Sequence, residues 1–154
     1  MIAKEFFFNI TTIDNLEVFV SEIMGHVSPQ EQHASIITLS GDLGAGKTTF
    51  TQKLGVQLGV VEGINSPTYV IEQRYPITNH SHFETLVHID AYRLEQEGDP
   101  VKIGLDQTLQ DPKNLVIIEW PEKIETFLKT YKKISLSLTQ KDSDRFAQVT
   151  ENCL

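Results

Sequence analysis

Residues 41–48 read Gly-Asp-Leu-Gly-Ala-Gly-Lys-Thr and match the pattern G-x-x-x-x-G-K-[ST] at every fixed position. In such a loop the small residues let the backbone curl around a phosphate with its N–H groups pointing inward. Lys47 is expected to reach the β- and γ-phosphates, and the hydroxyl of Thr48 is expected to coordinate Mg²⁺. The stretch therefore predicts a P-loop that binds a nucleoside triphosphate together with Mg²⁺.

The flanking sequence supplies the strand and the helix between which a P-loop lies. Residues 35–40 (SIITLS) form a short β-branched run, which predicts a buried strand. Residues 47–58 predict a helix with Phe50 and Leu54 facing the core and Gly59 ending it. The N-terminal end of that helix adds a positive dipole to the phosphate site.

The rest of the chain alternates between strand-like and helix-like patterns. Further strands are expected at residues 6–10, 69–75, 86–89, 115–118, 134–138 and 146–150, a turn at 76–82, and further helices at 13–24 (N-capped by Thr12), from Asp99 onward and at 121–128. This order predicts a single domain over residues 1–154 with an α/β, three-layer P-loop NTPase fold. Its central sheet is expected to be mostly parallel, with antiparallel edge strands and helices on both faces.

The overall composition argues against three classes of protein: disulfide or cysteine-zinc proteins, direct nucleic-acid binders and membrane proteins. The chain has 154 residues, a net charge of −8 and one cysteine, Cys153, which excludes an internal disulfide and a zinc site made of cysteine pairs. The negative charge argues against binding of RNA or DNA by the chain alone, but leaves docking onto an RNA-holding protein open. Since no apolar run approaches the roughly 20 residues of a membrane span and no signal-peptide pattern is present, we expect a cytoplasmic protein without membrane contact.

Two acids follow apolar runs that are expected to be buried strands. Asp90 follows residues 86–89, and Glu119 follows residues 115–118. Ligands of an open α/β sheet bind at the carboxyl ends of the strands, so both acids face the triphosphate if both strands lie beside the P-loop strand. One acid would then orient Mg²⁺ and the other would position or deprotonate the attacking water. The sequence leaves this division open, and an acid after a strand can also simply cap a helix.

Two further segments are candidates for contact with the nucleotide. Ser66-Pro67-Thr68 connects the P-loop helix to the next strand, where P-loop proteins can carry a switch that senses the γ-phosphate; the alternative is a plain turn. Trp120 follows Glu119 and is expected either to pack beside the nucleotide or to fill the core.

The histidines divide into two groups. His88 alternates with Asp90 along one strand, so the two side chains are expected to share a face. His80 and His82 have no acid or cysteine partner at metal-ligand spacing, and we interpret them as exposed turn residues.

The absence of two GTPase sequence motifs indicates which base the bound nucleotide carries. A GTPase shows Asn-Lys-x-Asp late in the chain, whereas the nearest stretch here is Gln140-Lys141-Asp142. A GTPase also shows Asp-x-x-Gly at the metal-binding acid, whereas Asp90 is followed by Ala-Tyr-Arg. These differences favour ATP.

Four stretches together resemble the TsaE (YjeE) family of small bacterial P-loop ATPases over roughly residues 5–150. They are residues 41–49 (GDLGAGKTT), 66–68 (SPT), 88–93 (HIDAYR) and 119–121 (EWP), in this order. Residues 28–34 and 97–107 fit the family pattern less well, which bears on partner contacts more than on ATP binding.

The resemblance implies a set of site residues for ATP and Mg²⁺. The implied catalytic residues are Lys47, Asp90 and Glu119, and the implied metal ligands are Thr48, Asp90 and Glu119. The implied nucleotide-binding residues are Gly41, Asp42, Leu43, Gly44, Ala45, Gly46, Lys47, Thr48, Thr49, Ser66, Thr68 and Trp120.

The resemblance also implies a biological role. The family acts in the threonylcarbamoyl modification of adenosine 37 in tRNAs that read ANN codons. Its ATPase docks on a complex of TsaB with the catalytic TsaD, hydrolyses ATP weakly without them, and meets tRNA only indirectly.

Two other functions remain open on the residues alone. A free-standing P-loop kinase for a small molecule would need an arginine-rich lid, and the chain has only Arg74, Arg93 and Arg145, which are scattered. A nucleotide-dependent binding switch would need ATP binding but not its hydrolysis.

Overall fold

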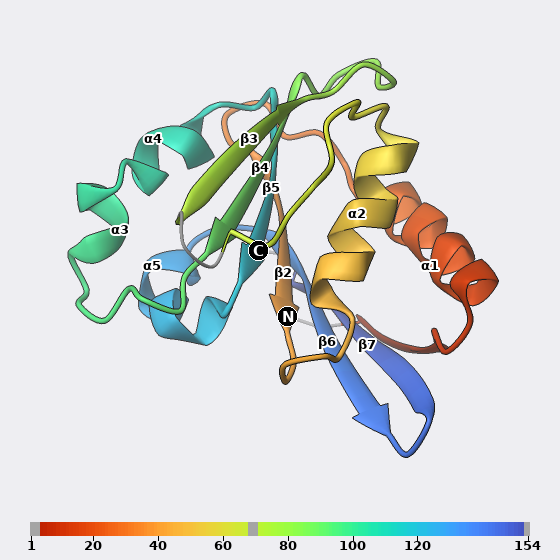
Figure 1. Cartoon of the computed structure of the whole chain (residues 1–154). Coiled ribbons are helices and arrows are strands. Elements are labelled where there is room, and N and C mark those ends of the chain that lie inside the picture. Colours follow the sequence, from red (N-terminus) through yellow and green to blue (C-terminus); the bar gives the residue numbers. More distant parts are fainter. Residues whose placement is uncertain (1–3, 68–70, 153–154) are drawn as a thin grey trace.

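A single mixed sheet forms the centre of the molecule. The computed structural model describes residues 4–67 and 71–152, and within these residues seven strands are arranged in the order β1-β7-β6-β2-β5-β4-β3 (Figure 1). The strands are β1 (Lys4–Asn9), β2 (Ser35–Ser40), β3 (Glu72–Pro76), β4 (Thr85–Asp90), β5 (Asn114–Glu119), β6 (Lys133–Lys141) and β7 (Asp144–Asn152).

The inner strands of the sheet are parallel. β2 pairs in parallel with β6 on one side and with β5 on the other, and β5 pairs in parallel with β4. Towards the edges, β3 is antiparallel to β4, and β7 is antiparallel to both β6 and β1. The expected parallel centre with antiparallel edge strands is therefore confirmed, and the carboxyl ends of β2, β5 and β4 meet at one edge of the sheet.

Helices cover both faces of the sheet, as expected. α1 (Ile13–His26) and α2 (Lys47–Gln57) lie on one face (Figure 1). The other face carries four short helices (Figure 1). These are α3 (Asp99–Lys102), α4 (Leu105–Gln110), the 3₁₀ helix η1 (Pro121–Ile124) and α5 (Glu125–Leu128).

The alternation of side chains along the strands builds one core on each face. Leu39 of β2 packs in the same core as Phe19 of α1 and Phe50 of α2. Ile36 of β2 packs in the second core together with Leu109 of α4. These side chains are at most 3% exposed, and each contributes roughly 1.5–3 kcal/mol through burial.

Most predicted elements are confirmed, with shifted ends. α2 ends one residue earlier than expected, and Gly59 follows it with φ of 70°. The helix expected at 121–128 is divided into η1 and α5. The strand expected at 69–75 is β3, displaced to Glu72–Pro76, and residues 69 and 70 lie outside the described part of the chain.

One helix was not predicted. α4 has only six residues, which is too short for a helical period to stand out from the surrounding sequence. It is ordered by tertiary packing, since Leu105 and Leu109 are buried in the second core. Within the described residues, every helix is too short or too polar to cross a bilayer.

The cap of α1 gives a direct test of the local structure. The hydroxyl of Thr12 accepts a hydrogen bond from the backbone N–H of Asn15 at 3.1 Å. We expect Thr12→Ala to lower the free energy of unfolding by about 1 kcal/mol in urea titrations, because one N–H at the helix start loses its partner. Thr130→Ala, at an exposed turn position, is the control and should change stability by less than about 0.5 kcal/mol. Equal effects of the two changes would contradict this role of Thr12.

Candidate nucleotide-binding site

The loop between β2 and α2 has the backbone geometry that a phosphate cradle needs. Gly41, Gly44 and Gly46 have φ of 148°, 83° and 108°, values that side-chain-bearing residues rarely adopt. A Cβ atom on Gly41 would lie 2.4 Å from the carbonyl oxygen of Leu138 in β6, so the neighbouring strand leaves no room for a side chain there. α2 begins at Lys47 directly after the last of these glycines, which brings its N-terminal end to the loop.

Lys47 is held inside the loop that it belongs to. Its side chain is only 8% exposed, and its ammonium group donates to the backbone carbonyl oxygens of Gly41 and, at 3.2 Å, of Asp42. The same ammonium lies 5.1 Å from the centre of the Trp120 ring, a cation–π distance. The P-loop lysine and the tryptophan that follows β5 are therefore neighbours, as expected if Trp120 lies near the nucleotide.

The two predicted acids lie side by side at the end of the sheet. Asp90 is the register partner of Glu119, and Glu119 is in turn the partner of Leu39 in the P-loop strand. The condition that both acidic strands lie directly beside the P-loop strand holds for β5 but not for β4. β5 lies between β2 and β4, and the other neighbour of β2 is β6.

Both acids are buried and fixed by hydrogen bonds. Asp90 is 8% exposed, and its Oδ1 accepts from the backbone N–H of Tyr92 at 3.0 Å. Glu119 is 4% exposed, and its Oε2 lies 3.1 Å from Nε2 of His88. The prediction that His88 shares a face with Asp90 fits the strand alternation, but the sequence did not predict its contact with Glu119, which comes from the neighbouring strand.

Trp120 takes an unusual backbone conformation directly after Glu119. Its φ is 56° and its ψ 50°, a left-handed conformation that is rare for a large side chain and disfavoured before a proline such as Pro121. Its ring meets the ring of Tyr92 edge-on at 5.1 Å, and the ammonium of Lys123 lies 5.3 Å from the centre of the Tyr92 ring. Tyr92 and Lys123 were not among the predicted site residues, because no motif marks an aromatic contact between two loops.

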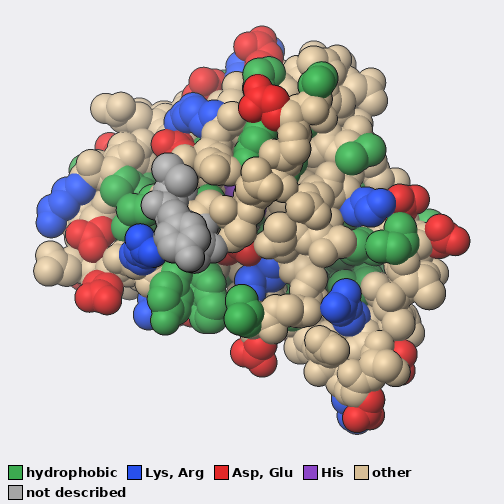
Figure 2. Space-filling model, viewed as in Figure 1, with side chains coloured by type: hydrophobic (Ala, Val, Ile, Leu, Met, Phe, Trp, Pro, Cys, Tyr) green, Lys and Arg blue, Asp and Glu red, His purple; other side chains and the backbone are tan. Residues whose placement is uncertain are grey.

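The loop region is also exposed and apolar on the outside. Leu43 at the tip of the loop is 98% exposed, and Tyr92 is 54% exposed. Figure 2 shows hydrophobic side chains gathered on this part of the surface, next to lysine and arginine side chains.

The other predicted site residues lie in the first turn of α2 and in the segment that connects α2 to β3. Thr48 and Thr49 are half-buried in the first turn of α2. Ser66 is exposed in the segment between α2 and β3, beside the buried Pro67. Thr68 lies outside the described residues, so its predicted part in a switch stays a prediction.

The side chains at the strand ends fit Mg²⁺ in their chemistry. Mg²⁺ prefers oxygen ligands and is usually bound by one or two carboxylates together with phosphates and water. Thr48, Asp90 and Glu119 supply a hydroxyl and two carboxylates at the loop and the adjacent strand ends. Among the described residues there is no group of three or more histidine, cysteine, aspartate or glutamate side chains that would hold a metal ion by themselves.

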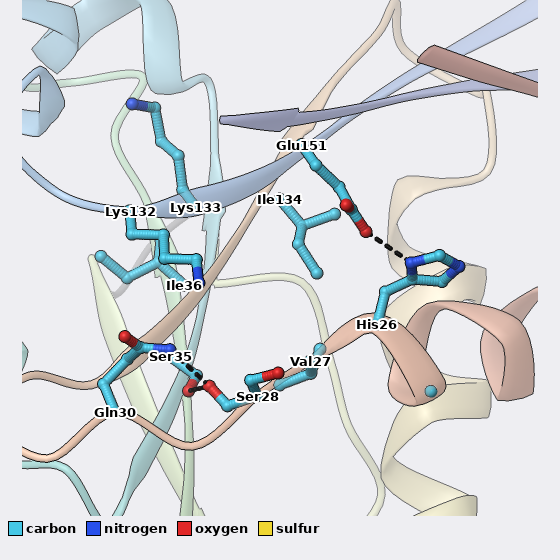
Figure 3. Close-up of a pocket in the computed structure, with 11 residues that line it drawn as sticks. His26, Val27, Ser28, Gln30, Ser35, Ile36, Lys132, Lys133, Ile134 and Glu151 are labelled. Carbon is cyan, nitrogen blue, oxygen red and sulfur yellow. Dashed lines mark hydrogen bonds and ion pairs between the residues drawn. The ribbon is translucent and has the colours of Figure 1, made fainter. Parts of the chain in front are cut away.

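A different pocket lies at the opposite end of the parallel strands. It has a volume of about 310 Å³ and is lined by the end of α1, the starts of β2 and β6, and Glu151 of β7 (Figure 3). Several of its polar groups bind one another: His26 pairs with Glu151 at 2.5 Å, and Ser35 and Gln30 both donate to the carbonyl oxygen of Ser28. None of the predicted site residues lines this pocket.

The two turn histidines differ from each other. His80 is exposed, as predicted. The part of its ring that is shielded from water lowers its pKa, and the charge of the nearby His82 lowers it further. His82 is half-buried rather than exposed, because its Nε2 donates to the carbonyl oxygen of Pro112 at 2.9 Å and its ring packs edge-on against Phe83. Its predicted exposure is therefore wrong.

A glycine loop between a central parallel strand and a helix, with acids at the ends of the adjoining strands, defines a P-loop NTPase-like α/β fold. The crystal structure of YdiB from Bacillus subtilis has the same fold, with a TM-score of 0.72, 22% identity, and coverage of 98% of this chain and 88% of that one. A family model described as "Threonylcarbamoyl adenosine biosynthesis protein TsaE" matches residues 12–148. The chain belongs to the TsaE family.

Curated relatives agree with this family. Proteins named "tRNA threonylcarbamoyladenosine biosynthesis protein TsaE" match from Streptomyces coelicolor at 44% identity over 92 residues and from Bacillus subtilis at 39% over 90 residues. These matches cover 58% of this chain and 60% and 52% of the two relatives, so the chain spans little more than half of their length. The relative from Nostoc sp. is 36% identical over 123 residues, covering 77% of this chain and 72% of its own.

The crowding at Gly41 leads to a test of the loop. We expect Gly41→Ala to lower the free energy of unfolding by about 1–3 kcal/mol in urea titrations, since the added methyl group meets the backbone of β6 and φ is unfavourable. The matched control is Gly25→Ala in α1, where a Cβ meets no atom within 4 Å and alanine favours the helix by roughly 0.5–1 kcal/mol. A Gly41→Ala protein as stable as the wild type would contradict this loop geometry.

Proposed function

We propose that this protein binds and hydrolyses ATP with Mg²⁺ and serves the threonylcarbamoyl modification of adenosine 37 in ANN-reading tRNAs. One observation carries the enzymatic part. The pairing of Leu39 with Glu119, and of Glu119 with Asp90, brings two buried carboxylates to the same sheet edge as the P-loop. The pathway is supported by membership of the TsaE family.

The residues of the chain would act in three ways. The backbone N–H groups of residues 41–48 and the first turn of α2 would hold the phosphates. Lys47 would exchange its contacts with the carbonyl oxygens of Gly41 and Asp42 for the β- and γ-phosphates, since its ammonium already lies inside the loop. Trp120, next to that ammonium, would cover the site from the side of β5.

The acids and the hydroxyl would hold the metal. Thr48 and Glu119 would bind Mg²⁺, and Asp90 would lie at the same metal and hydrolysis site. When bound, Mg²⁺ neutralises charge that develops on the phosphate oxygens during phosphoryl transfer. A carboxylate of this pair would orient the attacking water and accept its proton.

Two observations support a partner complex: the place of the family in a biosynthetic pathway and the negative charge of the chain. With a net charge of −8, the chain is poorly suited to grip tRNA itself, because polyanion binding depends on neutralisation of phosphates by lysine and arginine. We therefore propose that it works on the TsaB–TsaD complex and meets tRNA only through it, in the cytoplasm. The exposed Leu43 and Tyr92 beside the loop offer apolar surface for such docking.

The scattered arginines do not favour the kinase alternative. Arg74 pairs with Glu72 at 2.9 Å on β3, and Arg145 lies in the β6–β7 hairpin next to Thr11. Arg74 and Arg145 therefore lie on separate elements, β3 and β7, and Arg93, three residues after Asp90, is the one arginine that follows a strand ending at the candidate site.

The lysine provides a test of nucleotide binding. We expect Lys47→Ala to weaken binding of ATP with Mg²⁺ by about 10- to 100-fold in isothermal titration calorimetry, because it removes charge-assisted hydrogen bonds to phosphate. The matched control is Lys53→Ala further along α2, a half-buried lysine whose ammonium pairs with Glu17 of α1 at 2.9 Å; its affinity should equal that of the wild type. Equal affinities for all three proteins would refute the proposed phosphate site.

Glu119 provides a test of ATP hydrolysis and of its stimulation by the proposed partners. We expect slow ATP turnover by the protein alone, strong stimulation by purified TsaB and TsaD, and a loss of about 100-fold or more in Glu119→Ala. Glu122→Ala, at an exposed position three residues further on, is the control and should retain turnover.

Three outcomes would change the interpretation of this experiment. Absence of stimulation by TsaB and TsaD would count against the proposed assembly. Phosphoryl transfer from ATP to a small metabolite would support the kinase instead. Survival of the cellular tRNA modification in Glu119→Ala, despite lost hydrolysis, would identify a binding switch.

A further inference from the structure

His88 is a fully buried side chain of β4 that packing alone does not explain. Its exposed fraction is 0%, and its Nε2 lies 3.1 Å from Oε2 of Glu119, whose side chain is 5% exposed. The other ring nitrogen, Nδ1, is buried and has no hydrogen-bond partner among the described residues. A buried polar atom without a partner is rare in native proteins and calls for a reason.

Stability does not provide that reason. Burying an imidazole against a carboxylate removes both groups from water, and the attraction between such groups often fails to offset this cost. The unpartnered Nδ1 adds a further penalty. Leu86, two residues earlier on the same face of β4, is also 0% exposed and packs in the core without any such cost. An apolar residue at position 88 would therefore serve the core at least as well.

The hydrogen bond instead fixes the orientation of Glu119. An ionised carboxylate only accepts hydrogen bonds, so the contact places the hydrogen on Nε2 of His88. With the hydrogen on Nε2, the other ring nitrogen, Nδ1, is the one left without a hydrogen-bond partner in the core. Because the bond engages Oε2, it fixes the rotation of the carboxylate group and with it the direction in which Oε1 points.

We propose that His88 is a positioning residue that holds Glu119 in the orientation required for Mg²⁺-dependent ATP hydrolysis. The inference rests on the proposed function of this site and adds to it a residue from the neighbouring strand. Partners that orient metal-binding groups change metal affinity or activity by roughly 10- to 100-fold when they are removed. His88 does not touch the nucleotide in this role, because it acts only through Glu119.

Two variants separate positioning from simple space-filling. His88→Gln keeps an N–H donor at a similar distance from the backbone, whereas His88→Leu fills the space and removes the donor. We expect the Leu variant to need about 10- to 100-fold more Mg²⁺ for half-maximal tightening of ATP binding, followed by calorimetry, and to lose turnover by a similar factor. The Gln variant should restore both values to within about 3-fold of the wild type, and ATP binding without Mg²⁺ should be equal in all three proteins.

The control is a second histidine with the same kind of bond. Nε2 of His82 donates to the carbonyl oxygen of Pro112 at 2.9 Å, before the start of β4 and away from the P-loop end of the sheet. His82→Leu removes this bond and should leave the Mg²⁺ dependence and turnover unchanged.

The outcomes distinguish this inference from the proposed function. If the wild type neither binds nor hydrolyses ATP, the proposed function fails and the inference fails with it. If the wild type is active and His88→Leu matches it in Mg²⁺ dependence and turnover, only the inference is overturned.

A spectroscopic measurement keeps the test decisive if the Leu variant does not fold. The imidazole ¹⁵N spectrum of the wild-type protein, with the His88 signals assigned through His88→Gln, should show a protonated Nε2 and a bare Nδ1. The Nε2 signal should move when ATP and Mg²⁺ are added, because Glu119 gains a new neighbour. The proposal would be overturned if the spectrum showed the hydrogen of His88 on Nδ1 alone, or if the Nε2 signal did not shift when ATP and Mg²⁺ were added.

Discussion

The parallel pairing of β5 with β2 is the constraint on which the site depends. Leu39 is the last β2 residue paired with β5, and its partner is Glu119, so the P-loop and the first carboxylate leave the sheet at the same level. β4 then adds Asp90 in register with Glu119. A slip of this pairing by one residue would turn Glu119 to the opposite face, away from α2, and place Ile118 beside the loop. The cores on both faces prevent this slip, because Ile117 and Ile118 are each fully buried in a different core.

Burial of charge distinguishes this end of the sheet from the rest of the surface. Lys47, Asp90 and Glu119 are each at most 8% exposed, and each is held by a backbone group or a neighbouring side chain. Charges with so little exposure to water interact with their neighbours more strongly than the same charges in solvent. The left-handed backbone at Trp120 belongs to the same region, as expected where a local conformational cost is tolerated for a site.

The sequence predicts what depends on short-range signals. The spacing within residues 41–48 and the β-branched run before it predicted the loop, its strand and its helix, because sterics and hydrogen bonding act within a few residues there. The carboxylates Asp90 and Glu119 were also recognised, since each ends an apolar run. The position of β5 between β2 and β4 was not predictable, because strand order is decided by packing between distant segments. The contacts of Glu119 with His88, and of Tyr92 with Trp120, were missed for the same reason.

The pairing of β1 with β7 joins the two ends of the described chain, with Lys4 opposite Glu151. Contacts between residues so far apart in sequence form late, since a long loop must close before they contribute. β1 therefore has no strand to pair with until β7, the last strand of the described sheet, is in place. Phe8 of β1 has a nearer partner, since its ring lies 5.0 Å from the ring of Phe19 in α1, so this helix can cover part of the Phe6-Phe7-Phe8 stretch before the sheet closes.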